Sequence, residues 1–102
     1  MKKKEVIILP EAKADINDIK YDIKSISKSS HIARKNISDL RAELKCLSTY
    51  GASLAFYTGK NATNRYGTHI RRANTKNKKI AILYYVDPDY IIVKKIGWAS
   101  SI

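Results

Sequence analysis

The chain has 102 residues, of which 20 are Lys or Arg and 9 are Asp or Glu, so its formal net charge is +11. A chain of this length holds one domain with a modest core, which excludes a multidomain architecture. Its single cysteine, Cys46, excludes an internal disulfide, and no Cys/His cluster has metal-ligand spacing. So large an excess of positive charge favours a phosphate-rich or acidic partner. We expect one domain, residues 1–102, with no metal and no cofactor.

The N-terminal part of the chain predicts one strand followed by a helix. Residues 6–9 form a short aliphatic run, which favours a strand buried on both faces. This run is far shorter than the about 20 residues that span a bilayer, and no signal-peptide cleavage site follows it, so we expect a cytoplasmic protein without a membrane partner. Pro10 suits the first turn of a helix. The apolar stripe of that helix repeats every three or four residues: Ala12, Ile16, Ile19, Ile23 and Ile26.

A second helix follows a serine-rich connection. Ser29 or Ser30 can serve as its N-cap, and we expect it to begin near His31 and to end before Gly51. Its stripe has the same spacing: Ala33, Ile37, Leu40, Leu44 and Leu47. Two such stripes predict an antiparallel helical hairpin with one shared apolar face. Neither stripe contains a carboxylate or a histidine, so we expect both to serve core packing.

The C-terminal half predicts strands. Residues 51–65 favour a loop, although residues 54–57 offer a further short strand. From Tyr66 the apolar period becomes two, which predicts strands over 66–72, 80–86 and 90–96, with a turn at 74–77 and a hairpin turn at 87–89. The predicted fold class is α+β, in the order β-α-α-β-β-β. A helical hairpin packs on one face of a small, mostly antiparallel sheet.

Three residues are the candidate catalytic groups. If Ile70 faces the core, His69 and Arg71 share the open face of the sheet. His69 then serves as a general acid or base and Arg71 as a phosphate clamp; the alternatives are a polar surface residue and a salt bridge at the rim. Tyr85 has the same parity and can stack on a base, whereas Tyr84 falls in line with the core.

Other cations form a candidate nucleic-acid-binding set, which we expect near one end of the sheet, with a solvated charged surface as the alternative. The set comprises Arg72, Lys76, Lys78, Lys79, Lys94 and Lys95. Alternation places Arg72 on the face opposite to Arg71. At the C-terminus, Trp98 and Ile102 either cap the core or bind a partner.

Particular residues, in the order just described, resemble the RelE/ParE superfamily of bacterial toxins. The matching features are Pro10-Glu11-Ala12 after the first strand, Ala33 and Leu47 in the helical hairpin, Ile70-Arg71, residues 82–86, residues 91–93 and Ile96-Gly97. Together they cover nearly the whole chain. The resemblance implies a toxin of a type II toxin–antitoxin module, neutralised by a small antitoxin from an adjacent gene.

The resemblance leaves the target open. RelE-like members cut messenger RNA on the ribosome with basic residues of the sheet, and Arg71 matches the arginine of their middle strand. ParE-like members share the fold but inhibit DNA gyrase. This chain has Ala81 and Gly97-Trp98-Ala99 where many members carry cationic residues. A ribosome-dependent mRNA endonuclease is the leading hypothesis. A gyrase inhibitor and a plain basic nucleic-acid-binding module are the alternatives.

Overall fold

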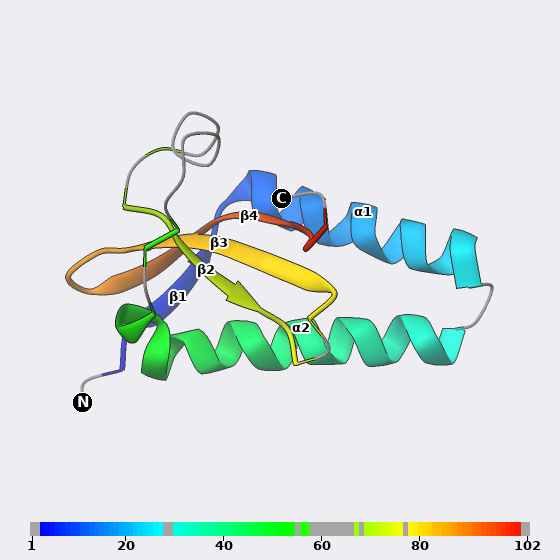
Figure 1. Ribbon diagram of the computed structural model, residues 1–102, viewed down its shortest axis with the longest axis horizontal. Coiled ribbons are helices and arrows are strands. Elements are labelled where there is room, and N and C mark those ends of the chain that lie inside the picture. Colours follow the sequence, from blue (N-terminus) through cyan, green and yellow to red (C-terminus); the bar gives the residue numbers. More distant parts are fainter. Residues whose placement is uncertain are drawn as a thin grey trace.

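Two helices lie side by side on one face of a four-stranded sheet (Figure 1). The computed structural model describes residues 3–27, 30–54, 56–57, 67, 69–76 and 78–100, and the side chains of 23–27 and 30–33 lie outside that description. The elements are β1 (Glu5–Ile8), α1 (Pro10–Ser27), α2 (Ser30–Tyr50), the short 3-10 helix η1 (Gly51–Ser53), β2 (Arg71–Asn74), β3 (Ile80–Val86) and β4 (Tyr90–Trp98). The strand order is β1-β4-β3-β2, with β1 parallel to β4 and the other pairs antiparallel. The predicted α+β class is confirmed.

Both helices form where the apolar spacing predicted them. α1 begins at Pro10, and the amide of Lys13 donates to the Leu9 carbonyl at 3.0 Å in its first turn. Every stripe residue whose side chain is described is buried or packs against the core: Ala12, Ile16, Ile19, Ile37, Leu40, Leu44 and Leu47. The stripe residues Ile23, Ile26 and Ala33 lie outside the described side chains. α2 begins at Ser30, one residue earlier than expected, and Ser29 lies outside the described residues.

The main core lies between the helices and the sheet. Tyr84 of β3 is fully buried there, and its hydroxyl donates to the Gly51 carbonyl at 2.7 Å. A Cβ added to Gly51 would lie 3.1 Å from Cδ1 of Ile91, so a larger residue at this close approach of the end of α2 to the sheet would push the Ile91 side chain aside. Trp98 packs against the same core and donates from Nε1 to Oδ2 of Asp22 at 3.2 Å. Trp98 therefore caps the core, whereas Ile102 lies outside the described residues.

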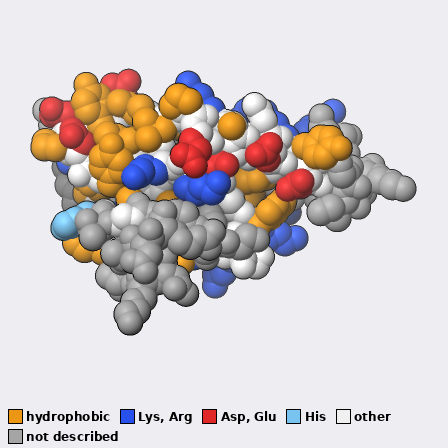
Figure 2. Space-filling model, turned by 90° about the horizontal axis from the view of Figure 1, so that it is seen from above, with side chains coloured by type: hydrophobic (Ala, Val, Ile, Leu, Met, Phe, Trp, Pro, Cys, Tyr) orange, Lys and Arg blue, Asp and Glu red, His pale blue; other side chains and the backbone are white. Residues whose placement is uncertain are grey.

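The prediction that the first strand is buried on both faces is wrong. β1 lies at the edge of the sheet and pairs with β4. Ile7 is 37% exposed, as is Tyr90 of β4 at 38%. A short aliphatic run does not tell a central strand from an edge strand, because its length and composition suit both. Hydrophobic side chains also gather on the surface at the end of the molecule where the β3–β4 hairpin lies (Figure 2).

The predicted strand over residues 66–72 is also wrong in its start and its alternation. β2 begins at Arg71, and His69 has a φ of 62°, in the left-handed region that strands do not use. Tyr66 and Thr68 lie outside the described residues. The short strand offered by residues 54–57 is reduced to one bridge between Phe56 and Arg71, beside a 2.6 Å hydrogen bond from the Tyr57 amide to the Ile70 carbonyl.

The remaining strands agree with the sequence patterns. β3 has the predicted bounds, and β4 runs two residues further than expected because Gly97 pairs with Ala81 and Trp98 pairs with Ile80. Within the described parts of the chain, neither helix is long and apolar enough to cross a membrane.

Candidate functional site

A hollow of about 480 Å³ lies at the corner of the sheet where β2 begins and β3 ends. It brings together the three candidate catalytic residues, which alternation alone placed on one face. Its lining residues are Phe56, Gly67, His69, Ile70, Arg71, Tyr85, Val86 and Lys94. These described residues offer an imidazole, a guanidinium, a phenol and an ammonium group, and none of them carries a carboxylate.

Phe56 organises one wall of the hollow. The guanidinium carbon of Arg71 lies 4.3 Å from the centre of the Phe56 ring, within cation–π range. The His69 ring meets the Phe56 ring edge-on, with centroids 5.4 Å apart and planes at 89°. Nη1 of Arg71 donates to the Leu54 carbonyl, and its buried Nε has no hydrogen-bond partner among the described residues. These contacts orient the Arg71 guanidinium and occupy one of its nitrogen donors.

The predicted faces of the two arginines are reversed. Arg71 pairs with Tyr84, whose ring belongs to the core, so Arg71 starts from the helix side of the sheet. Arg72 pairs with Leu83 on the other side. The prediction assumed that Ile70 faces the core under the helices. Ile70 is buried but does not belong to that core cluster, so the faces counted onward from it are exchanged. Arg71 still lines the hollow because it is the first residue of β2, at the corner.

Tyr85 follows its prediction, since it is half-buried and lines the hollow while Tyr84 is in the core. Nζ of Lys94 lies 5.7 Å from the centre of the Tyr85 ring. An aromatic ring with a cation above it, open to solvent on one side, is an arrangement that suits a nucleotide.

Arg72 connects three separate segments. Its Nε donates to Oδ1 of Asn74 at 3.2 Å, its Nη1 to the Tyr57 hydroxyl at 3.1 Å and its Nη2 to the Ala99 carbonyl at 3.0 Å. The guanidinium also lies over the Tyr57 ring at 5.1 Å. These contacts give Arg72 a structural role, and its part in nucleic-acid binding stays a prediction.

The predicted lysine set is not gathered at one end of the sheet. Lys76, Lys78 and Lys79 lie on the β2–β3 connection, at the opposite end of β2 from the hollow. Lys95 pairs with Asp15, at 3.1 Å between Nζ and Oδ1. The sequence argument failed because it placed the turn lysines and the arginines without knowing where β2 begins. Within the predicted set, Lys94 is the residue that lines the hollow.

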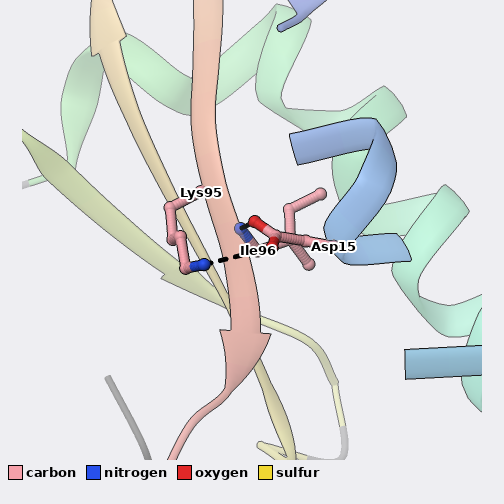
Figure 3. A network of polar contacts seen from close by, with 3 residues as sticks. All are labelled: Asp15, Lys95 and Ile96. Carbon is pink, nitrogen blue, oxygen red and sulfur yellow. Dashed lines mark hydrogen bonds and ion pairs between the residues drawn. The ribbon is translucent and has the colours of Figure 1, made fainter. Parts of the chain in front are cut away.

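The expectation that neither helical stripe contains a carboxylate is wrong, because Asp15 lies on the buried side of α1. It is 9% exposed on α1, and its two oxygens accept hydrogen bonds from Nζ of Lys95 and, at 3.0 Å, from the amide of Ile96 (Figure 3). A signal existed, because Asp15 stands three residues after Ala12 and four before Ile19 and therefore falls on the buried stripe. Figure 2 shows acidic and basic side chains side by side along the middle of the face that is seen from above.

Tyr84, which pairs with Arg71 beside the hollow, has a raised pKa because it is buried. Desolvation raises the pKa of Tyr84 to about 12, the nearby positive charge of Arg71 lowers it, and the negative charge of Glu43 raises it. Burial also raises the pKa of Glu43. Among the described residues, no group of three or more His, Cys, Asp or Glu side chains could hold a metal ion.

The comparisons with known proteins concern the fold. No family model matches the sequence, and no curated protein matches it. Among solved structures, the chain resembles one described as the "Chromosomal ParDE TA system from P. aeruginosa", with a TM-score of 0.75 and 14% sequence identity over 96% of this chain and 98% of that one. The chain therefore has the α+β fold of that ParDE-system protein, which is the fold that the resemblance to the RelE/ParE superfamily implied.

Proposed function

We propose that this chain is the toxin of a toxin–antitoxin module and acts in the cytoplasm as a ribosome-dependent mRNA endonuclease. The observation that carries the proposal is the hollow into which His69, Arg71, Tyr85 and Lys94 converge. The fold supports the first half, since "TA" in the description of the similar structure stands for toxin–antitoxin. A small antitoxin from a neighbouring gene is the partner that this function requires.

The chemistry of the hollow suits the cleavage of RNA without a metal. Arg71 and Lys94 would neutralise the charge on a backbone phosphate, and Tyr85 would stack on an adjacent base. The ribose 2′-oxygen then attacks the phosphorus, the bond from phosphorus to the 5′-oxygen breaks, and a cyclic 2′,3′-phosphate and a 5′-hydroxyl result. His69 is the candidate to accept the proton of the 2′-hydroxyl, and the departing 5′-oxygen takes a proton from solvent water to become the 5′-hydroxyl.

Charge supports the same substrate class. The formal net charge of +11 attracts polyanions from a distance. The hollow adds cations, and none of its described lining residues is a carboxylate that would oppose them. Most of the rate enhancement would come from holding the reacting groups in line and stabilising the phosphate charge. The ribosome would supply the remaining alignment of the message.

Growth of a bacterium that expresses the chain tests the toxin half of the proposal. Expression should arrest growth, and co-expression of the antitoxin that the proposal requires should restore it. Arg71→Ala together with Lys94→Ala should remove the arrest. Harmless expression of folded, soluble protein would contradict the proposal and favour a plain nucleic-acid-binding module.

Inhibition of DNA gyrase is the competing target. Ala81 is fully buried, and the end of β4 is engaged in core packing through Trp98, so neither offers a cation for cleavage. A supercoiling assay with purified gyrase separates the two targets. Inhibition at micromolar protein, with messages left intact, would replace the endonuclease by a gyrase inhibitor.

A further inference from the structure

β4 contains one residue more than β3 in the middle of their pairing. Leu83 pairs with Lys95 and Tyr84 pairs with Val93, so Lys94 has no partner across the ladder. A β-bulge of this kind leaves the extra residue unpaired, bends the strand and redirects side chains. Here the two lysines both leave the core side of β4, and Ile96 returns to the core with 1% exposure.

The bulge places two adjacent lysines in different surroundings. Nζ of Lys94 lies over the Tyr85 ring and lines the hollow, and among the described residues no carboxylate pairs with it. Nζ of Lys95 turns the other way and is 3.1 Å from Oδ1 of Asp15. Two consecutive lysines thus have different partners: Lys94 contacts the Tyr85 ring and Lys95 forms an ion pair with Asp15.

α1 fixes the backbone just after the bulge. β1 ends at Ile8, and the last bond from that segment to β4 runs from the Leu9 amide to the Val93 carbonyl at 3.1 Å. Beyond that point α1 takes the place of a neighbouring strand, because Oδ2 of Asp15 accepts the Ile96 amide at 3.0 Å. Figure 3 shows Asp15 reaching from α1 to both partners on β4.

We propose that Lys94 is the cation through which the hollow binds a phosphate group of single-stranded nucleic acid, and that Asp15 is a positioning residue that holds the bulge which aims Lys94 there. The inference rests on the proposed function in taking the hollow as the binding site. An ammonium group is a compact charge with three donors, which suits one phosphate. Arg71 complements it from the other wall, with part of its fork already bound to Leu54.

The matched pair Lys94→Ala and Lys45→Ala tests the role of Lys94, because Lys45 is an exposed lysine of α2. Each variant removes one unit from the net charge of +11. The probe is a single-stranded oligodeoxynucleotide, which has no 2′-hydroxyl and cannot be cleaved by the proposed route. We expect Lys94→Ala to weaken binding about tenfold and to reduce the magnitude of the slope of log K against log salt by about 0.7, with Lys45→Ala close to wild type. Equal losses in the two variants would overturn the assignment.

Removal of the Asp15 carboxylate tests its positioning role, because the two explanations predict opposite changes in the affinity for the oligonucleotide. Asp15→Ala raises the net charge by one unit, so long-range electrostatics predicts tighter binding of the oligonucleotide. The positioning role predicts weaker binding, by severalfold, in protein whose circular dichroism confirms folding. Asp15→Asn keeps an acceptor for the Ile96 amide and should weaken binding less, and it decides the matter if the alanine variant fails to fold. Unchanged or tighter binding in the folded variants would overturn the positioning role.

The binding assays need neither a ribosome nor cleavage. A negative binding result can therefore be told apart from a failure of the proposed endonuclease function. Selective loss in Lys94→Ala with no cleavage of messages would retain the phosphate site and remove the endonuclease. Cleavage that survives Lys94→Ala at the wild-type rate would retain the endonuclease and remove the role of Lys94.

Discussion

The hydroxyl of Tyr84 is a buried group whose contribution to stability can be calculated in size and in pH dependence. Tyr84 is fully buried, and its hydroxyl donates to the Gly51 carbonyl at 2.7 Å, where it ties β3 to the end of α2. Tyr84→Phe leaves that carbonyl without its donor. We expect the free energy of unfolding to fall by about 1–2 kcal/mol at pH 7, the usual cost of such a loss.

The same substitution should lose its effect in alkali. Burial raises the pKa of Tyr84 from 10.0 to about 12, so the folded protein holds this proton more tightly than the unfolded chain. The stabilisation is therefore complete below pH 10 and is lost as the pH rises from 10 to 12. At pH 11 the wild type should have lost about 1.4 kcal/mol, the equivalent of one pKa unit, relative to Tyr84→Phe.

Urea denaturation at pH 7 and pH 11, for wild type and Tyr84→Phe, measures both effects. Tyr90→Phe is the control at pH 7, because Tyr90 is 38% exposed and its change should stay within about 0.5 kcal/mol. A difference between wild type and Tyr84→Phe that is equally large at both pH values would refute the argument from burial. A difference near zero at pH 7 would refute the hydrogen bond to Gly51.

Three further changes test the packing around the site. Arg72→Ala should destabilise the protein by about 1–2 kcal/mol and expose the segment after Trp98 to protease, because the hydrogen bond to the Ala99 carbonyl is lost. One ammonium group cannot make the three contacts of Arg72, so an Arg72→Lys variant as stable as wild type would contradict their importance. Gly51→Ala should lower the melting temperature, since its Cβ would lie 3.1 Å from Cδ1 of Ile91, and adding Ile91→Val should restore part of the loss; purely additive effects would argue against that contact. Leu40→Ala, fully buried, should cost about 2–5 kcal/mol in denaturant unfolding, and a loss under 1 kcal/mol would contradict its place in the core.

The helices and the last two strands were predictable because their signals are local. Spacing of three and four places Ala12, Ile19 and Leu40 on buried stripes, and a period of two separates Tyr84 from Tyr85. Alternation predicts the two faces of β3 correctly because the extra residue of the bulge lies in β4, so the side chains of β3 alternate without interruption.

The corner of the sheet was less predictable because backbone irregularities decide it. The left-handed conformation of His69 interrupts the strand pattern before Ile70, and Ile70 is buried outside the core cluster beneath the helices, so counting from it assigns Arg71 and Arg72 to the wrong faces. The bulge at Lys94 changes the direction of the next lysine. Both depend on pairing partners far away in sequence. Asp15 is a different case, since its position on a buried stripe was visible, but its partner is an amide on β4, which composition does not reveal.

Mapping of message cleavage in a translating extract tests the central claim most directly. Purified wild-type protein should produce breaks within codons on ribosome-bound messages, with a cyclic phosphate at the new 3′ end. Lys94→Ala and Arg71→Ala should reduce those breaks at least tenfold, while Lys76→Ala, at the far end of β2, leaves them unchanged. Intact messages at protein concentrations that arrest growth would contradict the account.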